Sequence, residues 1–241
     1  MSDSKNINSE EIIAARSADV ILGPDSEGDC FWPSYAGYAS YAIGLLDAIG
    51  YKGKFSVAGV FWGGALAQQI AHSYSHLISR MILIATTSGV TMVPGRLSAI
   101  FHMTTPQRYL SSNFMKRNAA HIYGGELRGH PENAAKISRL TKPLTVLAYL
   151  QRLIAGSKFS SLPWLWRIRC PVLVMAGDDN PIVRLINARI LVRILPNAQL
   201  QIIKGGGHLF ILMQPELTAK TVKSFLKMDC SQYPRYETAS F

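Results

Sequence analysis

Short apolar runs alternate with longer segments of helical periodicity along this chain. The apolar runs predict strands at residues 18–23, 55–59, 80–85, 171–177 and 199–204. Apolar residues spaced three and four apart predict helices at residues 34–49, 64–74, 182–195 and 216–227. The alternation predicts an α/β fold, with a mostly parallel sheet of about five strands and helices on both faces.

The helix predicted at residues 34–49 has many apolar positions, so its buried face has to be inferred from their spacing. The spacing favours a core-facing stripe of Tyr38, Tyr41, Ala42, Leu45, Leu46 and Ile49. Gly50 follows the last of these residues and is expected to end the helix.

Length and composition indicate one intracellular globular domain. The chain has 241 residues, of which 48% are hydrophobic, yet no apolar run approaches the roughly 18 residues of a membrane span. The N-terminus is polar and lacks the apolar region of a signal peptide. We therefore expect a cytoplasmic protein without a transmembrane segment.

Charge and cysteine content exclude several further classes. The net charge is +10, but the basic residues are scattered and form no dense block, so we do not expect nucleic-acid binding. Cys30, Cys170 and Cys230 are far apart and include no C-x-x-C pair. Neither a disulfide framework nor a metal site is indicated.

The stretch from residue 54 to residue 74 carries the most specific motif. A predicted strand is followed by glycines and then a helix, and Gly59 and Gly63 have the spacing of the G-x-S-x-G nucleophile elbow. The central residue is Phe61, whose ring cannot attack a carbonyl. In the fold whose nucleophile elbow this motif resembles, the central residue is held at positive φ, so the resemblance implies that Gly59, Gly63 and Gly64 preserve the turn and that Phe61 lies at positive φ with its ring directed toward His208.

The run GVFWGGALAQQIAHSY, together with residues 86–95 (TTSGVTMVPG) and 173–212, resembles the α/β-hydrolases. The resemblance is specific to the intracellular depolymerases of medium-chain-length polyhydroxyalkanoate, which have a serine where Phe61 stands. It covers residues 19–227 and implies hydrolysis of carboxylic esters by a Ser-Asp-His triad, without metal or cofactor.

The resemblance also assigns the remaining site residues. His208, in the run GGGHLF, takes the place of the base, and Asn180 takes the place of the orienting acid. Asp179 is a candidate substitute for that acid. The backbone N–H of Trp62 is one expected oxyanion donor.

As replacement nucleophiles, Cys30, Ser56 and Ser88 are the nearest candidates along the chain, but none is expected on a turn that faces His208.

The resemblance further divides the chain. The relatives have three strands before residue 18 that this sequence lacks, together with the loop that supplies a second oxyanion donor, so the strand at 18–23 is expected to pair with 55–59. We expect a polar segment at 1–17, a hydrolase-like domain at 18–228 with a helical cap at 86–163, and a loose tail at 229–241. Trp164 and Trp166 are expected either to line an acyl-binding cleft or to belong to the core.

Three functions remain open from the sequence. The leading hypothesis is a catalytically impaired, N-terminally truncated relative of the polyhydroxyalkanoate depolymerases. The alternative is a non-catalytic module that binds an acyl chain, a polyester granule surface or a protein partner. Residual esterase activity, through water activated by His208, is the third and weakest alternative.

Overall fold

The computed structural model describes residues 34–105, 112–130, 133 and 154–228. Within these ranges four strands form one sheet, in the order β1 (Phe55–Val60), β2 (Ile78–Ile84), β3 (Val172–Gly177) and β4 (Ala198–Ile203). All three pairings are parallel, with Val60 opposite Ile84 and Gly177 opposite Ile203. The predicted α/β fold with a parallel sheet is therefore confirmed.

Several predictions lie outside the described residues. They are the strand at 18–23 with its pairing to 55–59, the segment at 1–17 and the tail at 229–241. The segment predicted as a cap is described only in part, because residues 106–111, 131–132 and 134–153 are not covered.

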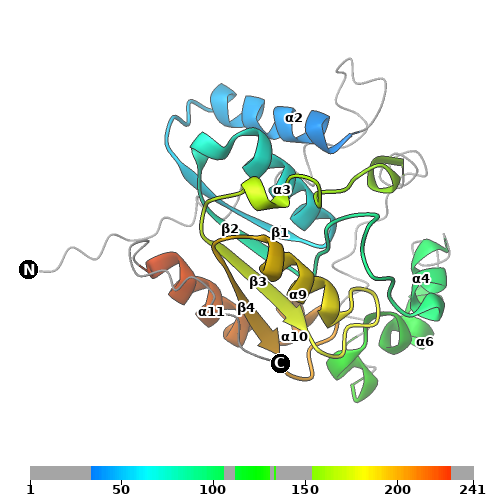
Figure 1. Cartoon of the computed structure of the whole chain (residues 1–241). Helices are drawn as coiled ribbons and strands as arrows, with labels where there is room; N and C mark the ends of the chain where they lie inside the picture. Colours follow the sequence, from blue (N-terminus) through cyan, green and yellow to red (C-terminus); the bar gives the residue numbers. More distant parts are fainter. Residues whose placement is uncertain (1–33, 106–111, 131–132, 134–153, 229–241) are drawn as a thin grey trace, which may run out of the picture.

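Helices connect and cover the strands (Figure 1). The α-helices are α2 (Tyr35–Ala48), α3 (Trp62–Ser73), α4 (Leu97–Thr104), α6 (Ser112–Tyr123), α9 (Leu185–Ile194), α10 (Phe210–Met213) and α11 (Pro215–Lys227). Short 3-10 turns are η2 (Ser75–Leu77), η3 (Gly125–Arg128) and η4 (Leu165–Arg167). The helices predicted from periodicity correspond to α2, α3, α9 and α11, with ends shifted by a few residues.

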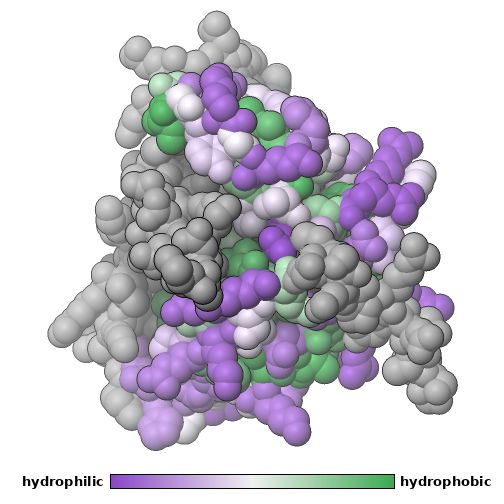
Figure 2. All heavy atoms as spheres, turned by 90° about the vertical axis from the view of Figure 1, so that its left-hand side faces the viewer, coloured by the Kyte–Doolittle hydropathy of each residue, from purple (hydrophilic) through white to green (hydrophobic). Residues whose placement is uncertain are grey.

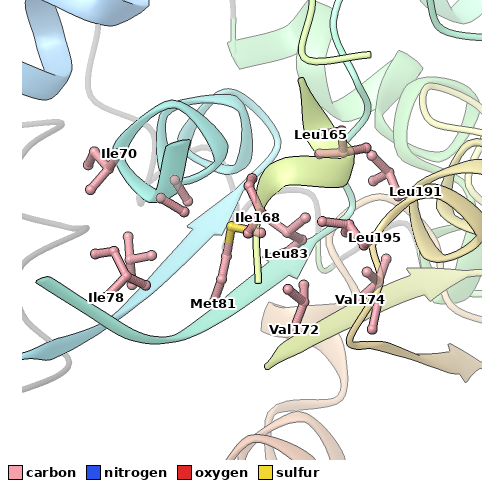
Figure 3. Close-up of a cluster of buried hydrophobic side chains, with 14 of the residues drawn as sticks. Ile70, Ile78, Met81, Leu83, Leu165, Ile168, Val172, Val174, Leu191 and Leu195 are labelled. Carbon is pink, nitrogen blue, oxygen red and sulfur yellow. The ribbon is translucent and has the colours of Figure 1, made fainter. Parts of the chain in front are cut away.

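The side chains of each buried strand alternate between the two faces of the sheet. Met81 and Leu83 of β2 point toward α3 and α9, where they join the cluster shown in Figure 3. Ile82 and Ile84 point the other way and pack with Phe225 of α11. Helices therefore cover both faces, as predicted, with α2 and α3 on one side and α11 on the other (Figure 1).

The buried face of α2 agrees with the predicted stripe only in part. Tyr38, Ala42 and Leu46 pack partly buried against the core, as expected. The fully buried positions are instead Tyr35, Ala39 and Ile43, and Ile49, expected in the core, is 69% exposed. The helix begins after Ser34, whose side chain accepts a hydrogen bond from the backbone N–H of Gly37. From this start, Tyr35 stacks on Trp62 of α3, and that contact selects a face that apolar periodicity alone did not identify.

None of the helices in the described ranges has both the length and the apolar character that a membrane span requires. On the face drawn in Figure 2, hydrophilic residues cover much of the described surface, with smaller hydrophobic areas between them.

Candidate active site

The candidate site lies at the carboxyl edge of the sheet. Phe61 directly follows β1, Thr86 follows β2, Asn180 follows β3 and His208 follows β4. Because all four strands are parallel, these loops meet at the same edge, which is where open α/β sheets bind ligands. Residues separated by up to 147 positions are thereby brought to one place.

Phe61 occupies the strained position of the turn between β1 and α3. Its φ is 50° and its ψ is −104°, a conformation that costs a bulky residue about 1–3 kcal/mol. Its N–H donates to the carbonyl of Ile84 at 3.0 Å, and its carbonyl accepts from the Thr86 hydroxyl at 2.7 Å. The end of β2 therefore holds the elbow in place, and the predicted positive φ is confirmed.

Two of the three elbow glycines are required by close packing. A Cβ on Gly59 would lie 2.1 Å from the carbonyl oxygen of Gly63, and a Cβ on Gly64 would lie 2.5 Å from Thr86 Cβ. A Cβ on Gly63 would meet nothing within 4 Å. The prediction that all three glycines preserve the turn is therefore wrong for Gly63, whose position has room for a side chain.

The Phe61 ring packs against the imidazole of His208. The two ring centroids are 4.9 Å apart and the planes are nearly perpendicular, at 88°. This contact confirms that Phe61 points toward His208. The ring takes up apolar contact in the region where the resemblance places a nucleophilic hydroxyl.

The His208 loop is fixed by the end of α6. His208 N–H donates to the Tyr123 carbonyl at 2.6 Å, and the two rings lie nearly parallel, 6.2 Å apart. A Cβ on Gly207 would lie 2.3 Å from that same carbonyl oxygen. The glycine run before His208 thus allows a close backbone approach. Sequence reasoning missed Tyr123, because nothing in its local pattern marks it as a partner of a loop 85 positions away.

Asn180 contacts His208 through its side chain. Nδ2 of Asn180 lies 3.2 Å from Nδ1 of His208, and both residues are buried. Oδ1 of Asn180 accepts hydrogen bonds from the backbone N–H groups of Ile182 and Val183, each at 3.0 Å. The structure therefore brings together Phe61, Asn180 and His208, as the motifs indicated.

An apolar cavity of about 310 Å³ lies beside the elbow. Its walls are formed mainly by aromatic and aliphatic side chains, including Tyr35, Phe61, Trp62, Ala65, Val90, Met92 and Phe159. The volume is at the lower end of the range of small-molecule pockets, about 300–1,000 Å³. The site could accommodate an apolar ligand of modest size.

Comparisons with known proteins show the family of this chain. Residues 35–215 match the family model described as "alpha/beta hydrolase fold". The chain belongs to the α/β-hydrolase fold family. It is 40% identical over 195 residues to a poly(3-hydroxyalkanoate) depolymerase of Ectopseudomonas oleovorans, an alignment that covers 81% of this chain and 68% of that protein.

Solved structures of α/β-hydrolases show the same fold at low sequence identity. A thermophilic esterase from Thermogutta terrifontis superimposes with a TM-score of 0.65 at 22% identity, covering 81% of this chain and 73% of the esterase. The enol-lactonase from Burkholderia xenovorans gives 0.67 at 16% identity, covering 81% and 74%. At these identities the likeness supports the fold alone.

In this α/β-hydrolase, Asp179 is paired with Arg128 rather than with His208. Oδ2 of Asp179 accepts from Arg128 Nε at 2.7 Å and from the Gly125 N–H at 2.8 Å. Partial burial works to raise the pKa of Asp179, but these hydrogen bonds and the charges of Arg128 and Arg96 outweigh it and lower the pKa. The structure gives no support to Asp179 as a substitute acid.

The other candidate nucleophiles have different partners. The Ser56 hydroxyl contacts the Ser79 hydroxyl at 3.0 Å, and the Ser88 hydroxyl lies 3.3 Å from that of Thr91. Cys30 lies outside the described residues. Burial raises the pKa of the Cys170 thiol to about 12, so this cysteine is a neutral thiol at physiological pH.

The structure does not bring Trp164 and Trp166 to the cavity. Trp164 stacks on His72 of α3, with centroids 4.3 Å apart, and packs with the core. Trp166 is 49% exposed and donates its indole N–H to the Pro163 carbonyl. The cavity instead uses the ring of Trp62, whose N–H begins α3 and has no acceptor within that helix.

No group of three or more His, Cys, Asp or Glu side chains in the described ranges is arranged to hold a metal ion.

Proposed function

We propose that this α/β-hydrolase is a catalytically impaired relative of enzymes that hydrolyse carboxylic esters, with polyhydroxyalkanoate as the substrate class of its lineage. The observation that carries the proposal is Phe61 at the tip of the elbow, with its ring against His208. The 40% identity to a poly(3-hydroxyalkanoate) depolymerase supports the substrate class.

Acyl transfer by a Ser-Asp-His triad needs a nucleophile and a charged acid, and the residues at these two positions supply neither. Phe61 offers no oxygen or sulfur to attack the carbonyl, so no acyl-enzyme can form at the elbow. Asn180 is neutral and cannot stabilise an imidazolium by charge, as an aspartate would. The Trp62 N–H would still serve as an oxyanion donor, but an oxyanion donor without a nucleophile gives no covalent catalysis.

The cavity beside the elbow favours a second candidate, a module that binds an acyl chain without hydrolysing it. Its volume of about 310 Å³ is roughly twice that of an apolar cavity known to bind benzene. Burial of apolar ligand surface in this cavity would favour binding, because each Å² removed from water contributes about 25 cal/mol of favourable free energy. Association with a granule surface or a protein partner rests on the resemblance alone.

Hydrolysis of p-nitrophenyl octanoate and of suspended poly(3-hydroxyoctanoate) tests the first candidate. We expect the purified protein to give the same rate as a His208→Ala variant, because His208 has no nucleophile to activate. A rate above that control, removed by His208→Ala, would overturn the proposed loss of catalysis.

Calorimetric titration with octanoate and with its methyl ester tests the second candidate. Ser157 is exposed and lines the cavity, so a Ser157→Trp variant should obstruct it. Lys158 is the next residue, exposed and absent from the cavity wall, so Lys158→Trp is the matched control. Binding that persists in the control and disappears in Ser157→Trp supports the module, whereas equal binding in both variants argues against it.

A further inference from the structure

The amide orientation of Asn180 is determined by its backbone partners. Its side-chain oxygen accepts from two N–H groups, those of Ile182 and Val183, at 3.0 Å each. The reversed amide would place NH₂ hydrogens against those two N–H donors. Asn180 is only 6% exposed, so water could not replace the two lost hydrogen bonds.

This orientation leaves the amide nitrogen facing His208. Nδ2 of Asn180 lies 3.2 Å from Nδ1 of His208, and an amide nitrogen can only donate. His208 Nδ1 must therefore accept, which requires a lone pair rather than a hydrogen on that atom. We propose that Asn180 is a positioning residue that fixes neutral His208 as the tautomer protonated on Nε2.

The consequence is a reversal of the role of Nε2. A general base in a hydrolase triad accepts the nucleophile's proton on Nε2, while its Nδ1–H donates to the acid. In the tautomer fixed by Asn180, Nε2 already carries a hydrogen and is a donor. His208 would then be unsuited to proton abstraction through Nε2 whatever residue occupies position 61.

A carboxylate at position 180 would reverse the tautomer. Both of its oxygens are acceptors. One could keep the hydrogen bonds from the N–H groups of Ile182 and Val183, while the other accepts a hydrogen bond from His208 Nδ1–H. The variant Asn180→Asp differs from the parent in one atom of nearly equal size. It therefore separates the hydrogen-bonding role of Asn180 from its packing.

This inference deepens the proposed function, and its meaning for catalysis rests on that proposal, but the tautomer can be measured without any activity. Long-range ¹H–¹⁵N correlation spectra of protein labelled with ¹⁵N-histidine distinguish protonated from unprotonated ring nitrogens. A His208→Gln variant identifies the His208 signals. A measurement near pH 8, above the ordinary His pKa of about 6.5, favours the neutral ring.

We expect the parent to show His208 with a proton on Nε2 and none on Nδ1, and Asn180→Asp to exchange the two signals. His72, which stacks on Trp164 away from this site, should be unchanged and serves as the internal control. Any parent spectrum with a proton on Nδ1, alone or in an imidazolium, overturns the inference. If Asn180→Asp does not fold, the parent spectrum alone decides.

An inactive protein with Nδ1–H would refute the tautomer and leave the loss of catalysis standing, whereas ester hydrolysis by the parent would refute the proposed function.

Discussion

Phe61 meets His208 edge to face, with ring centroids 4.9 Å apart, from a backbone position at positive φ. Two opposing contributions to the free energy of folding arise at Phe61. The backbone conformation costs about 1–3 kcal/mol, and burial of a phenylalanine side chain contributes up to about 1.5–3 kcal/mol. The contact with His208 therefore helps to offset the strain that the elbow imposes.

Replacement of Phe61 by glycine should change the free energy of unfolding by no more than about 1–2 kcal/mol, because relieved strain and lost burial oppose each other. Phe61→Ala loses the ring and keeps the strain, so it should be less stable than Phe61→Gly by about 1–2 kcal/mol. Urea unfolding of both variants measures the difference. A Phe61→Ala variant more stable than Phe61→Gly would contradict the balance described above.

The packing of α3 against the end of β2 predicts different effects for two adjacent glycines. Gly64→Ala places a Cβ 2.5 Å from Thr86 Cβ and should destabilise the protein, because buried overpacking typically costs about 1–3 kcal/mol. Gly63→Ala has open space and should be neutral or slightly stabilising, since alanine favours the helix by up to about 1 kcal/mol. Equal losses of thermal stability in the two variants would show that the close approach to Thr86 is unimportant.

The pairing of Asp179 with Arg128 predicts an acid-sensitive contribution to stability. The folded-state pKa of Asp179 is lowered from its ordinary 3.8, so the contribution is present above that value and is lost as pH falls through the folded-state pKa. The Tm difference between the parent and Asp179→Asn should be largest near neutral pH and shrink below about pH 4. A difference that stays constant down to about pH 2 would exclude this role.

A serine at position 61 should not restore catalysis by itself. In Phe61→Ser the neighbouring His208 would still carry its proton on Nε2, so hydrolysis of p-nitrophenyl octanoate should not exceed that of Phe61→Ser/His208→Ala. Adding Asn180→Asp should raise the rate, since the corresponding Asp-to-Asn change in a Ser-His-Asp triad lowers turnover roughly ten-thousandfold. His208-dependent hydrolysis by Phe61→Ser alone would contradict the role given to Asn180.

Much of the fold could be predicted because the signals were local. The apolar runs located all four described strands, and the glycine spacing located the elbow. The fully buried positions of α2 could not be predicted in this way, because apolar residues lie all round that helix and tertiary contacts, such as that of Tyr35 with Trp62, select among them. Periodicity identifies a face only where the opposite face is polar.

In the candidate site, too, the sequence predicted what local motifs encode and missed what depends on contacts between distant residues. Motif positions placed Phe61, Asn180 and His208 together, but the direction of Asp179 depends on Arg128, 51 positions earlier in the chain. The aromatic residues near the cavity depend on packing as well, since Trp62 lines the cavity while Trp164 and Trp166 do not. Neither the Arg128 pairing nor the Tyr123 contact has a signal in the local sequence.

Reaction of the purified parent with a fluorophosphonate probe, followed by intact-protein mass spectrometry, tests the proposed absence of a serine nucleophile most directly. The probe forms a stable covalent adduct with a serine whose hydroxyl is activated by a neighbouring base. The account predicts that the mass stays that of the unmodified chain, as in a His208→Ala control treated identically. A stoichiometric adduct on any serine of the parent, absent from His208→Ala, would contradict it.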